Sequence, residues 1–233
     1  MRAFYPISIV TTVAAVWCLV LALMPAAALC RVITKLPGDA HVVALTFDAC
    51  PTRPPQHFDR VVLDYLIREK LPATLFISGR FAQKNSDEIK KLSRLDFIEI
   101  ENHSISHNNH METLGEAEIR KDMDDSVLAS LTGKRTKFFR FPAGNYDEKA
   151  LAIVESRYAV VHWTFASGDP VLRITPEMLV LSVMAQVKPG SILIFHINGK
   201  GYSTGAALPK IIDALKKKGY RFVRLEDVLN TSR

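Results

Sequence analysis

Seven short apolar runs alternate along this chain with segments whose apolar residues recur at helical spacing. The runs are rich in β-branched and aromatic residues, which favour strands. They cover residues 41–47, 73–78, 96–101, 138–141, 158–165, 191–196 and 221–225. Between them we expect helices over residues 58–70, from 86 towards 95, over 116–131, from 176 onward and over 206–218. The Thr175-Pro176 pair marks a helix start, and Gly133 and Gly219 mark helix ends.

This alternation of strands and helices predicts an α/β fold built on a parallel sheet. A barrel and a doubly wound sheet both fit the pattern. We favour a (β/α) barrel of about seven parallel strands, because polar residues capable of chemistry follow several of the strands. In (β/α) barrels the chemistry lies at the carboxyl ends of the strands. No repeat, low-complexity tract or long linker divides the pattern, so we expect a single domain.

The first residues differ from the rest of the chain. After Arg2, residues 7–24 carry no charge, and residues 26–28 are three alanines, as at a signal-peptidase site. We therefore expect a signal peptide over residues 1–28, a catalytic domain over 29–233, and export to the periplasm or the medium. The alternative is a retained N-terminal membrane anchor, since the uncharged stretch nearly reaches spanning length. If the signal is cleaved, no stable membrane span remains.

Composition narrows the function classes. The chain has 233 residues, 48% of them hydrophobic, which is enough for a full core, and a formal net charge of +6. The basic residues of 134–137 and 216–218 do not alternate with aromatic residues, so we expect no nucleic-acid partner. A serine hydrolase is disfavoured because there is no Gly-x-Ser-x-Gly motif. The segment Gly199-Lys200-Gly201 lacks the spacing of a phosphate-binding loop.

The cysteine count agrees with export. Cys18 lies within the predicted signal, so the mature chain keeps Cys30 and Cys50. An even pair in an oxidising compartment indicates a disulfide between them. The alternative role for Cys50 is that of a thiolate ligand to a metal.

Two histidines stand out among the polar residues that follow the strands. His103 and His107 are four residues apart, which places them on one face of a helical turn, about 5–6 Å apart at Cβ. Two imidazoles at this distance suit a zinc-type ion, although ordinary surface or core histidines show the same spacing. The other strand ends carry further candidates for a hydrolytic site, namely Asp48, Arg140, Asp169 and His196.

Five motifs in a fixed order carry a family resemblance. They are TFDACP at residues 46–51, NHSISH at 102–107, RFPAG at 140–144, the segment 163–169 and IFH at 194–196. Over about residues 42–229 the chain resembles the polysaccharide deacetylase (NodB-homology) family of carbohydrate esterases. The resemblance implies a distorted (β/α) barrel with seven strands, in agreement with the number of apolar runs.

The resemblance also implies an activity. It indicates a metal-dependent hydrolase that removes N-acetyl groups from N-acetylated glycans, which are chitin-like or peptidoglycan-type polymers or oligomers. The implied cofactor is a divalent metal, with zinc as the first candidate, and its ligands are His103 and His107. The motifs do not distinguish one glycan from another or indicate an oligomeric state.

Roles for the remaining residues follow from the same resemblance. Asp48 matches the general base and His196 the general acid. Arg140 matches the arginine that positions the base, and Asp169 the carboxylate that pairs with this arginine, although an ordinary buried ion pair would look the same. The acetyl group is expected to meet the backbone N–H at Ala143 and the side chains of Trp163 and Ile194. His41, His57 and His162 are interpreted as structural.

The chain departs from the family at position 49. The family has an aspartate there as third metal ligand, and Ala49 cannot coordinate a metal. Three outcomes stay open: two histidines plus water with Asp48 drawn closer, another donor, or a catalytically impaired glycan-binding envelope protein on the same fold. We favour retained catalysis because the base, the arginine, its carboxylate and the acid are all present. The alternative donors are His110, Glu101, Asn108 and Cys50.

Overall fold

The computed structural model describes residues 32–51 and 56–229. The predicted signal peptide and Cys30 lie outside the described residues. The described residues belong to one compact unit, in agreement with the predicted single domain. None of their helices is long and apolar enough to cross a membrane.

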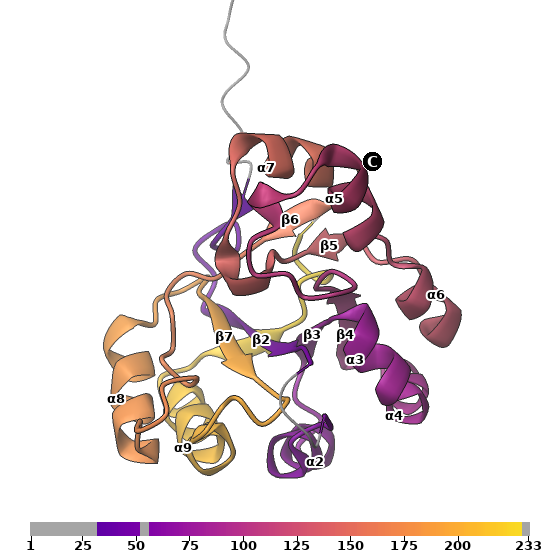
Figure 1. Cartoon of the computed structure of the whole chain (residues 1–233). Helices are drawn as coiled ribbons and strands as arrows, with labels where there is room; N and C mark the ends of the chain where they lie inside the picture. The colour runs from indigo at the N-terminus through magenta and orange to yellow at the C-terminus, as the bar shows by residue number, and fades with distance from the viewer. Residues whose placement is uncertain (1–31, 52–55, 230–233) are drawn as a thin grey trace, which may run out of the picture. The chain divides into compact units, whose positions relative to one another are not determined.

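A single sheet with all neighbours parallel organises the described chain (Figure 1). The strand order is β1-β6-β5-β4-β3-β2-β7, and β8 also pairs with β2. The ends of this path meet through two isolated bridges, Lys35 with Ser191 and Phe165 with Leu193, without a continuous ladder. This is the predicted distorted barrel, which the structure confirms. The strands are β1 (Val32–Ile33), β2 (Val42–Ala49), β3 (Ala73–Ile77), β4 (Ile98–Asn102), β5 (Phe138–Phe139), β6 (Ala159–Val161), β7 (Ile192–His196) and β8 (Arg221–Val223).

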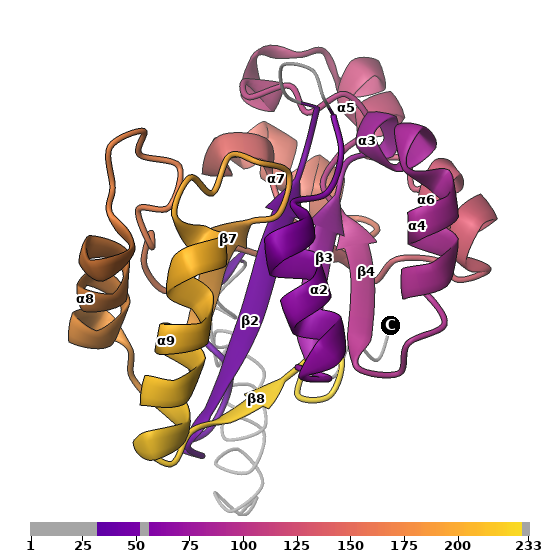
Figure 2. The ribbon, with the colours of Figure 1, turned by 90° about the horizontal axis from the view of Figure 1, so that it is seen from below.

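Helices connect most of these strands, and Figure 2 shows α2 and α9 lying over β2. The helices are α2 (Arg60–Arg68), α3 (Gly79–Lys84), α4 (Ser86–Leu92), α5 (Glu116–Asp122), α6 (Ser126–Thr132), α7 (Glu148–Glu155), α8 (Pro176–Gln186) and α9 (Thr204–Lys217). Short 3₁₀ turns cover Met111–Thr113 and Pro142–Gly144. The predicted cap at Thr175 is present, since its side chain accepts a hydrogen bond from the backbone N–H of Met178.

The helix predicted over residues 116–131 is in fact two helices, α5 and α6. The chain leaves the helical path at residues 123–125. There the carboxylate of Asp124 accepts the backbone N–H of Ser126, and Arg157 forms ion pairs with both Asp124 and Asp125. Short acidic side chains that find partners outside the helix favour a break, because they compete with the backbone for hydrogen bonds.

Strand β2 shows how the two faces of the sheet are set. Successive side chains of a strand point to opposite faces. Leu45, Phe47 and Ala49 belong to the large apolar cluster that includes residues of α2 and α9. Ala44 belongs to a separate cluster on the other face, and Asp48 shares that face. The alternation therefore points Asp48 away from the helices and packs Ala49 towards them.

Candidate active site

The candidate residues lie at the carboxyl ends of neighbouring strands. Asp48, near the end of β2, is in register with His196, the last residue of β7. His103 directly follows β4, and Arg140 directly follows β5. Parallel strands bring such ends to one edge of a barrel, where (β/α) barrels place their active sites. The structure therefore brings these four residues to one end of the sheet.

Arg140 holds Asp48 in place. Its Nη1 donates to Oδ1 of Asp48 at 2.7 Å, and both side chains are almost completely buried. The other guanidinium donors bond the backbone carbonyls of Val161 and His162, at 3.2 and 3.0 Å, and the group lies 4.0 Å above the Phe76 ring. Burial acts to raise the pKa of Asp48, but Arg140, together with His103 and His196, outweighs it and holds this pKa below its ordinary value. Asp48 is therefore an ionised carboxylate with a fixed direction.

The two histidines come together on a loop, and the helical turn predicted from their spacing is absent. Ser104 and His107 have φ angles of 64° and 57°, in the left-handed region that a helix does not use. The backbone N–H of Ile105 donates to the carbonyl oxygen of Asp122, and that of His107 to Oγ of Ser104. These bonds fix a loop in which the rings of His103 and His107 lie with centroids 4.8 Å apart.

The surroundings of both imidazoles favour the neutral form. Burial lowers the pKa of His103, and burial together with His103 lowers the pKa of His107 to about 3. Nδ1 of His103 lies 2.9 Å from the carbonyl oxygen of Arg140, which can only accept, so this nitrogen carries the proton. The lone pair on Nε2 then faces Oδ2 of Asp48 at 3.5 Å. Nε2 of His103 and the carboxylate of Asp48 therefore face the same space.

The described residues offer only two ligands for a divalent ion at this place, the imidazoles of His103 and His107. Ala49 is fully buried in the apolar cluster, so an aspartate there would have to turn out of this cluster to reach the histidines. Among residues 32–51 and 56–229, no group of three or more His, Cys, Asp or Glu side chains is arranged to hold a metal. Neutral imidazoles are suitable ligands for zinc. His103 and His107 could therefore hold such an ion, with the remaining positions left to water or substrate.

The four alternative donors are engaged elsewhere. His110 is exposed, with its Nδ1 2.9 Å from Oε1 of Glu112, and Oδ1 of Asn108 accepts the backbone N–H of His110. Glu101 accepts backbone N–H groups of the chain that enters β5. Cys50 is buried, and burial raises the pKa of its thiol. Because Cys30 lies outside the described residues, the expected disulfide stays a prediction.

Asp169 pairs with His196, and the predicted pair between Asp169 and Arg140 is wrong. Oδ1 of Asp169 lies 3.0 Å from Nδ1 of His196, and Oδ2 accepts the backbone N–H of His196 at 2.6 Å. The donors of Arg140 are already taken by Asp48 and two backbone carbonyls. Burial acts to lower the pKa of His196, but the bond and charge of Asp169 outweigh it and raise this pKa. His196 is therefore held ready to carry a proton.

Two residues that sequence reasoning missed surround Asp169. Oγ1 of Thr204 donates to Oδ2 of Asp169 at 2.9 Å. A Cβ added to Gly201 would lie 2.3 Å from that Oγ1 and 2.7 Å from Oδ2, so only glycine lets the loop close over the carboxylate. The available signal was the Gly199-Lys200-Gly201 segment, which directly follows the last motif.

Of the three residues expected around the acetyl group, two lie next to each other and the third lies apart. Ala143 is exposed in a turn, with a φ of 54°. A Cβ on Gly144 would come within 2.7 Å of Cη2 of Trp163, so the indole packs directly against this turn. Ile194, on β7 two residues before His196, is buried, with 7% of the residue's surface exposed. Ala143 and Trp163 therefore adjoin each other, and Ile194 lies within the sheet.

Comparisons with known proteins agree with this site. The family model described as polysaccharide deacetylase matches residues 35–159. A peptidoglycan-N-acetylglucosamine deacetylase of Bacillus cereus is 32% identical over 202 residues, which cover 84% of this chain and 71% of the relative. The comparison confirms the expected class of enzyme, a deacetylase.

Two solved structures share the fold and differ in what they say about catalysis. A family 4 acetyl xylan esterase from Clostridium thermocellum, solved with a cobalt ion, has a TM-score of 0.71 and 28% identity, covering 80% of this chain and 89% of that chain. BA3943 of Bacillus anthracis, described as a CE4 family pseudoenzyme, has a TM-score of 0.75 and 25% identity, covering 85% and 69%. The family match, the deacetylase relative and the shared fold lead to one conclusion: this chain belongs to the polysaccharide deacetylase family of carbohydrate esterases.

Proposed function

We propose that this chain is a metal-dependent hydrolase that removes N-acetyl groups from N-acetylated glycans of the peptidoglycan or chitin-like type. One observation carries the proposal: at one end of the barrel a carboxylate, Asp48, and an imidazole, His196, each lie beside a buried partner that favours the charged form. Asp48 lies beside the guanidinium of Arg140, and Asp169 lies beside the imidazole of His196. Environments that separate the protonation of two groups in this way identify a base and an acid.

Asp48 is suited to accept a proton from the attacking water. An acetamide resists neutral water, so the nucleophile must lose a proton as it attacks. The guanidinium of Arg140 keeps Asp48 ionised down to low pH because it lowers the pKa of the carboxyl. Since Oδ1 is bound to Arg140, Oδ2 is the oxygen free for the proton. A pre-aimed carboxylate needs little rearrangement during the step.

His196 is suited to protonate the departing amine. The hydrogen bond from Nδ1 to Asp169 leaves Nε2 as the nitrogen that can give up a proton. Because Asp169 raises the pKa of His196, the imidazolium is present at a higher pH than for an ordinary histidine. The sugar amine then leaves as a neutral group, and acetate remains.

The metal proposed at His103 and His107 has a defined purpose. A divalent ion, with zinc as the first candidate, would when bound supply a Lewis acid that polarises the acetamide carbonyl. The hydrogen bond from His103 to the carbonyl of Arg140 orients its Nε2 for this role. Ala143 and Trp163 offer the exposed turn and the apolar wall against which the acetyl methyl can pack.

We place the reaction outside the cytoplasm. The predicted signal peptide over residues 1–28 directs the chain to the periplasm or the medium, with an N-terminal membrane anchor as the alternative. Peptidoglycan is an envelope polymer, and the B. cereus relative is named for its action on it. Export and the glycan substrate therefore support each other.

The experiment is acetate release by the purified protein from N-acetylglucosamine oligomers and from peptidoglycan, with metal content measured in parallel. Asp48→Asn should lower turnover by about 10²–10⁴-fold, the usual contribution of a general base. Because Asp48 is not one of the proposed ligands, metal content should largely survive. Unchanged turnover in this variant would reject Asp48 as the base.

A second candidate function is a glycan-binding envelope protein with impaired catalysis. Two observations favour it: the methyl of Ala49 is packed in the apolar cluster, and BA3943 of B. anthracis is described as a pseudoenzyme. A mutant of that protein, 26% identical to this chain with a TM-score of 0.75, is described as having restored enzymatic activity. Glycan binding without acetate release at any metal concentration would establish this candidate in place of the enzyme.

A further inference from the structure

Four aromatic side chains pack together next to Arg140. This ring cluster consists of Phe141, Tyr146, His162 and Trp163. The imidazole of His162 stacks on the indole of Trp163, with ring centroids 5.1 Å apart and an interplanar angle of 11°. The ring of Tyr146 meets the same imidazole edge-on, at 5.3 Å and 78°. Aromatic rings favour stacked and edge-to-face contacts at such distances, so His162 connects the tyrosine to the tryptophan.

The ring cluster adjoins the proposed site through Arg140. The backbone carbonyl oxygen of His162 accepts a hydrogen bond from Nη2 of Arg140 at 3.0 Å. The guanidinium of Arg140 also lies 5.7 Å from the centre of the Trp163 ring and donates to Oδ1 of Asp48 at 2.7 Å. One residue therefore connects the indole to the proposed base.

The indole of Trp163 is limited by two neighbours. Trp163 is only half-buried, so solvent does not fix its position. A Cβ on Gly144 would lie 2.7 Å from Cη2 of the indole, so the turn at Pro142–Gly144 limits one end of the ring system. The stacked imidazole of His162 covers one of its faces. Because His162 is buried, truncating its side chain would leave a cavity into which the indole can turn.

His162 contributes a flat and uncharged ring. Among the described residues, its buried Nε2 has no hydrogen-bond partner. Burial, and after it the charge of Arg140, lowers the pKa of His162 to about 4. The neutral imidazole therefore prevails near neutral pH. Its contribution to Trp163 is the shape of the ring, which a phenyl ring can reproduce.

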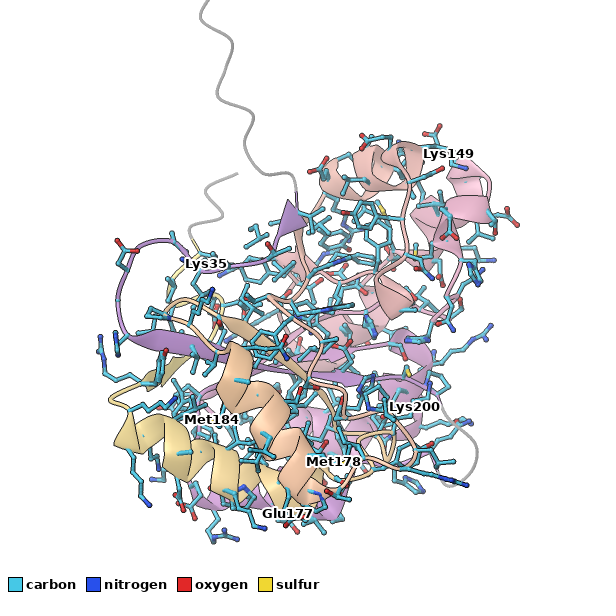
Figure 3. The ribbon with its side chains drawn as sticks, turned by 90° about the vertical axis from the view of Figure 1, so that its left-hand side faces the viewer. Lys35, Lys149, Glu177, Met178, Met184 and Lys200 are labelled. Carbon is cyan, nitrogen blue, oxygen red and sulfur yellow. The ribbon has the colours of Figure 1, made fainter. Side chains whose placement is uncertain are left out.

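The tyrosine of the ring cluster is itself held in place. Tyr146 stacks on Phe141, with ring centroids 5.3 Å apart. Three residues further along, Lys149 lies in the first turn of α7 (Figure 3). Its Nζ donates to the backbone carbonyl oxygens of Glu112 and Leu114, at 3.0 and 2.9 Å. These contacts fix the segment that carries the tyrosine against His162.

We propose that His162 is a positioning residue that sets the acyl selectivity of this site, because its imidazole holds the indole of Trp163 where the pocket admits an acetyl group and excludes a longer acyl group. The proposal rests on the proposed deacetylase function, in which Trp163 is the apolar wall for the acetyl methyl. One additional methylene in an apolar pocket changes kcat/KM by about 10–200-fold. A wall that can turn aside loses much of this discrimination.

The first test observes the indole itself and needs no turnover. Acrylamide quenching of tryptophan fluorescence is compared for wild type, His162→Ala and His162→Phe. The chain has two tryptophans, Trp17 and Trp163, so subtracting the signal of the same protein with Trp163→Phe isolates Trp163. His162→Ala should raise the quenching constant about two-fold or more, because a freed side chain gains alternative positions. His162→Phe should stay close to wild type.

His41 gives the matched control. Its ring stacks on Tyr220 at 5.0 Å and 17°, nearly the geometry of His162 on Trp163. His41 precedes β2, whereas Asp48 lies near the other end of that strand. His41→Ala should therefore leave the quenching of Trp163 and the acyl selectivity unchanged. A quenching constant that is the same in His162→Ala as in wild type overturns the proposal.

The second test compares the release of acetate and propionate from N-acetylated and N-propionylated glucosamine oligomers. Wild type should prefer the acetyl substrate by at least about ten-fold in kcat/KM. His162→Ala should raise KM for this substrate about 2–10-fold, with a much smaller change in kcat, because substrate must then order the indole. Its preference for acetyl should fall at least about three-fold, and His162→Phe should restore it.

The outcomes separate the proposal from the proposed function. Wild type that releases propionate as readily as acetate, or an unchanged preference in His162→Ala, overturns the role in selectivity. If wild type releases neither acid, the proposed function fails, and acrylamide quenching still decides whether His162 holds the indole. Should His162→Ala fail to fold by circular dichroism, His162→Leu takes its place with the same expected results, since leucine fills the space without a planar ring.

Discussion

Two groups of carboxylates in this protein are equally buried and respond in opposite ways. Asp48 has 4% of its surface exposed, and Glu99 and Glu101 on β4 have 5% and 3%. The pKa of Asp48 is lowered, whereas the pKa of Glu101 is raised well above its ordinary value, first by burial and then by Glu99. Burial alone raises the pKa of any carboxyl group. The difference therefore lies in the neighbour, which is the buried guanidinium of Arg140 in one case and a second carboxyl group in the other.

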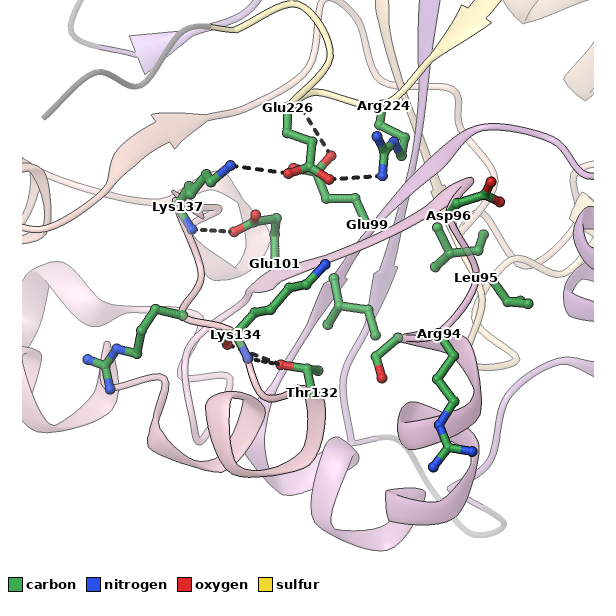
Figure 4. Close-up of a pocket in the computed structure, with 14 residues that line it drawn as sticks. Arg94, Leu95, Asp96, Glu99, Glu101, Thr132, Lys134, Lys137, Arg224 and Glu226 are labelled. Atoms are coloured by element: carbon green, nitrogen blue, oxygen red, sulfur yellow. Dashed lines mark hydrogen bonds and ion pairs between the residues drawn. The ribbon is translucent and has the colours of Figure 1, made fainter.

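The glutamates lie beside a short ladder of the sheet. Strands β4 and β5 share only the register pair Asn102 with Phe139. Beside this short ladder, Oε2 of Glu101 accepts the backbone N–H groups of Lys137 and Phe138, both at 2.8 Å. Glu99 and Glu101 line a cavity of about 620 Å³ there (Figure 4). Here a carboxyl group accepts the backbone N–H groups at the start of β5, whereas Asp48 is kept charged.

Removing the guanidinium gives the largest expected effect on this comparison. Arg140→Met leaves Asp48 buried without its partner, and this should cost about 3–5 kcal/mol in the free energy of unfolding. The pKa of Asp48 should then rise as that of Glu101 does. Urea unfolding at neutral pH measures the loss. The double variant Arg140→Met/Asp48→Asn should recover much of it, and a loss below about 1 kcal/mol in the single variant would show that Arg140 does not control Asp48.

The pair of Asp169 and His196 should give an effect of intermediate size. Asp169→Asn removes the charge that raises the pKa of His196, at a cost of about 1.5–3 kcal/mol for a hydrogen bond to a charged group. Because the raised pKa belongs to the folded state, this stability is present below the ordinary value of 6.5 and is lost as the pH rises through the raised value. The alkaline limb of acetate release should therefore move to lower pH. A limb that stays in place would remove His196 as the acid.

The smallest effect is expected beside the short ladder between β4 and β5. Glu101→Gln keeps an oxygen for the N–H groups of Lys137 and Phe138, so the free energy of unfolding at neutral pH should fall by less than about 1 kcal/mol or rise. The raised pKa of Glu101 means that wild type loses stability as the pH rises from the ordinary value towards the folded one. Thermal unfolding across this range should be flatter for the variant. If the stability of the variant fell as steeply with pH as that of wild type, the pH dependence would belong to a group other than Glu101.

The sequence predicted the interior of the fold better than its edges. Strands β2, β3, β4 and β7 fall within or close to the predicted ranges. Strands β2, β3 and β7 are mostly apolar along their length, as strands buried on both faces are, whereas β4 alternates isoleucine with glutamate. Strand β1, with two residues, is too short to leave such a signal. Helix α7 was missed although Asp147 caps it by accepting the backbone N–H of Ala150. That cap was readable in the sequence, whereas the break between α5 and α6 depends on Arg157 from a distant segment.

The motifs located the site, but they did not predict how its residues pair. Asp169 binds His196 because the donors of Arg140 are used by Asp48 and by carbonyls of β6 and the residue after it. No spacing along the chain reports such competition between partners. The segment from His103 to His107 was interpreted as a helical turn because the two histidines are four residues apart. The backbone at Ser104 and His107 is left-handed, so the segment is a loop instead.

One residue serves the carboxylate and the imidazole at once. The guanidinium of Arg140 binds Asp48, and the backbone carbonyl oxygen of the same residue accepts a hydrogen bond from Nδ1 of His103. Because both groups are held through one residue, any substitution that displaces Arg140 would misalign the carboxylate and the imidazole together.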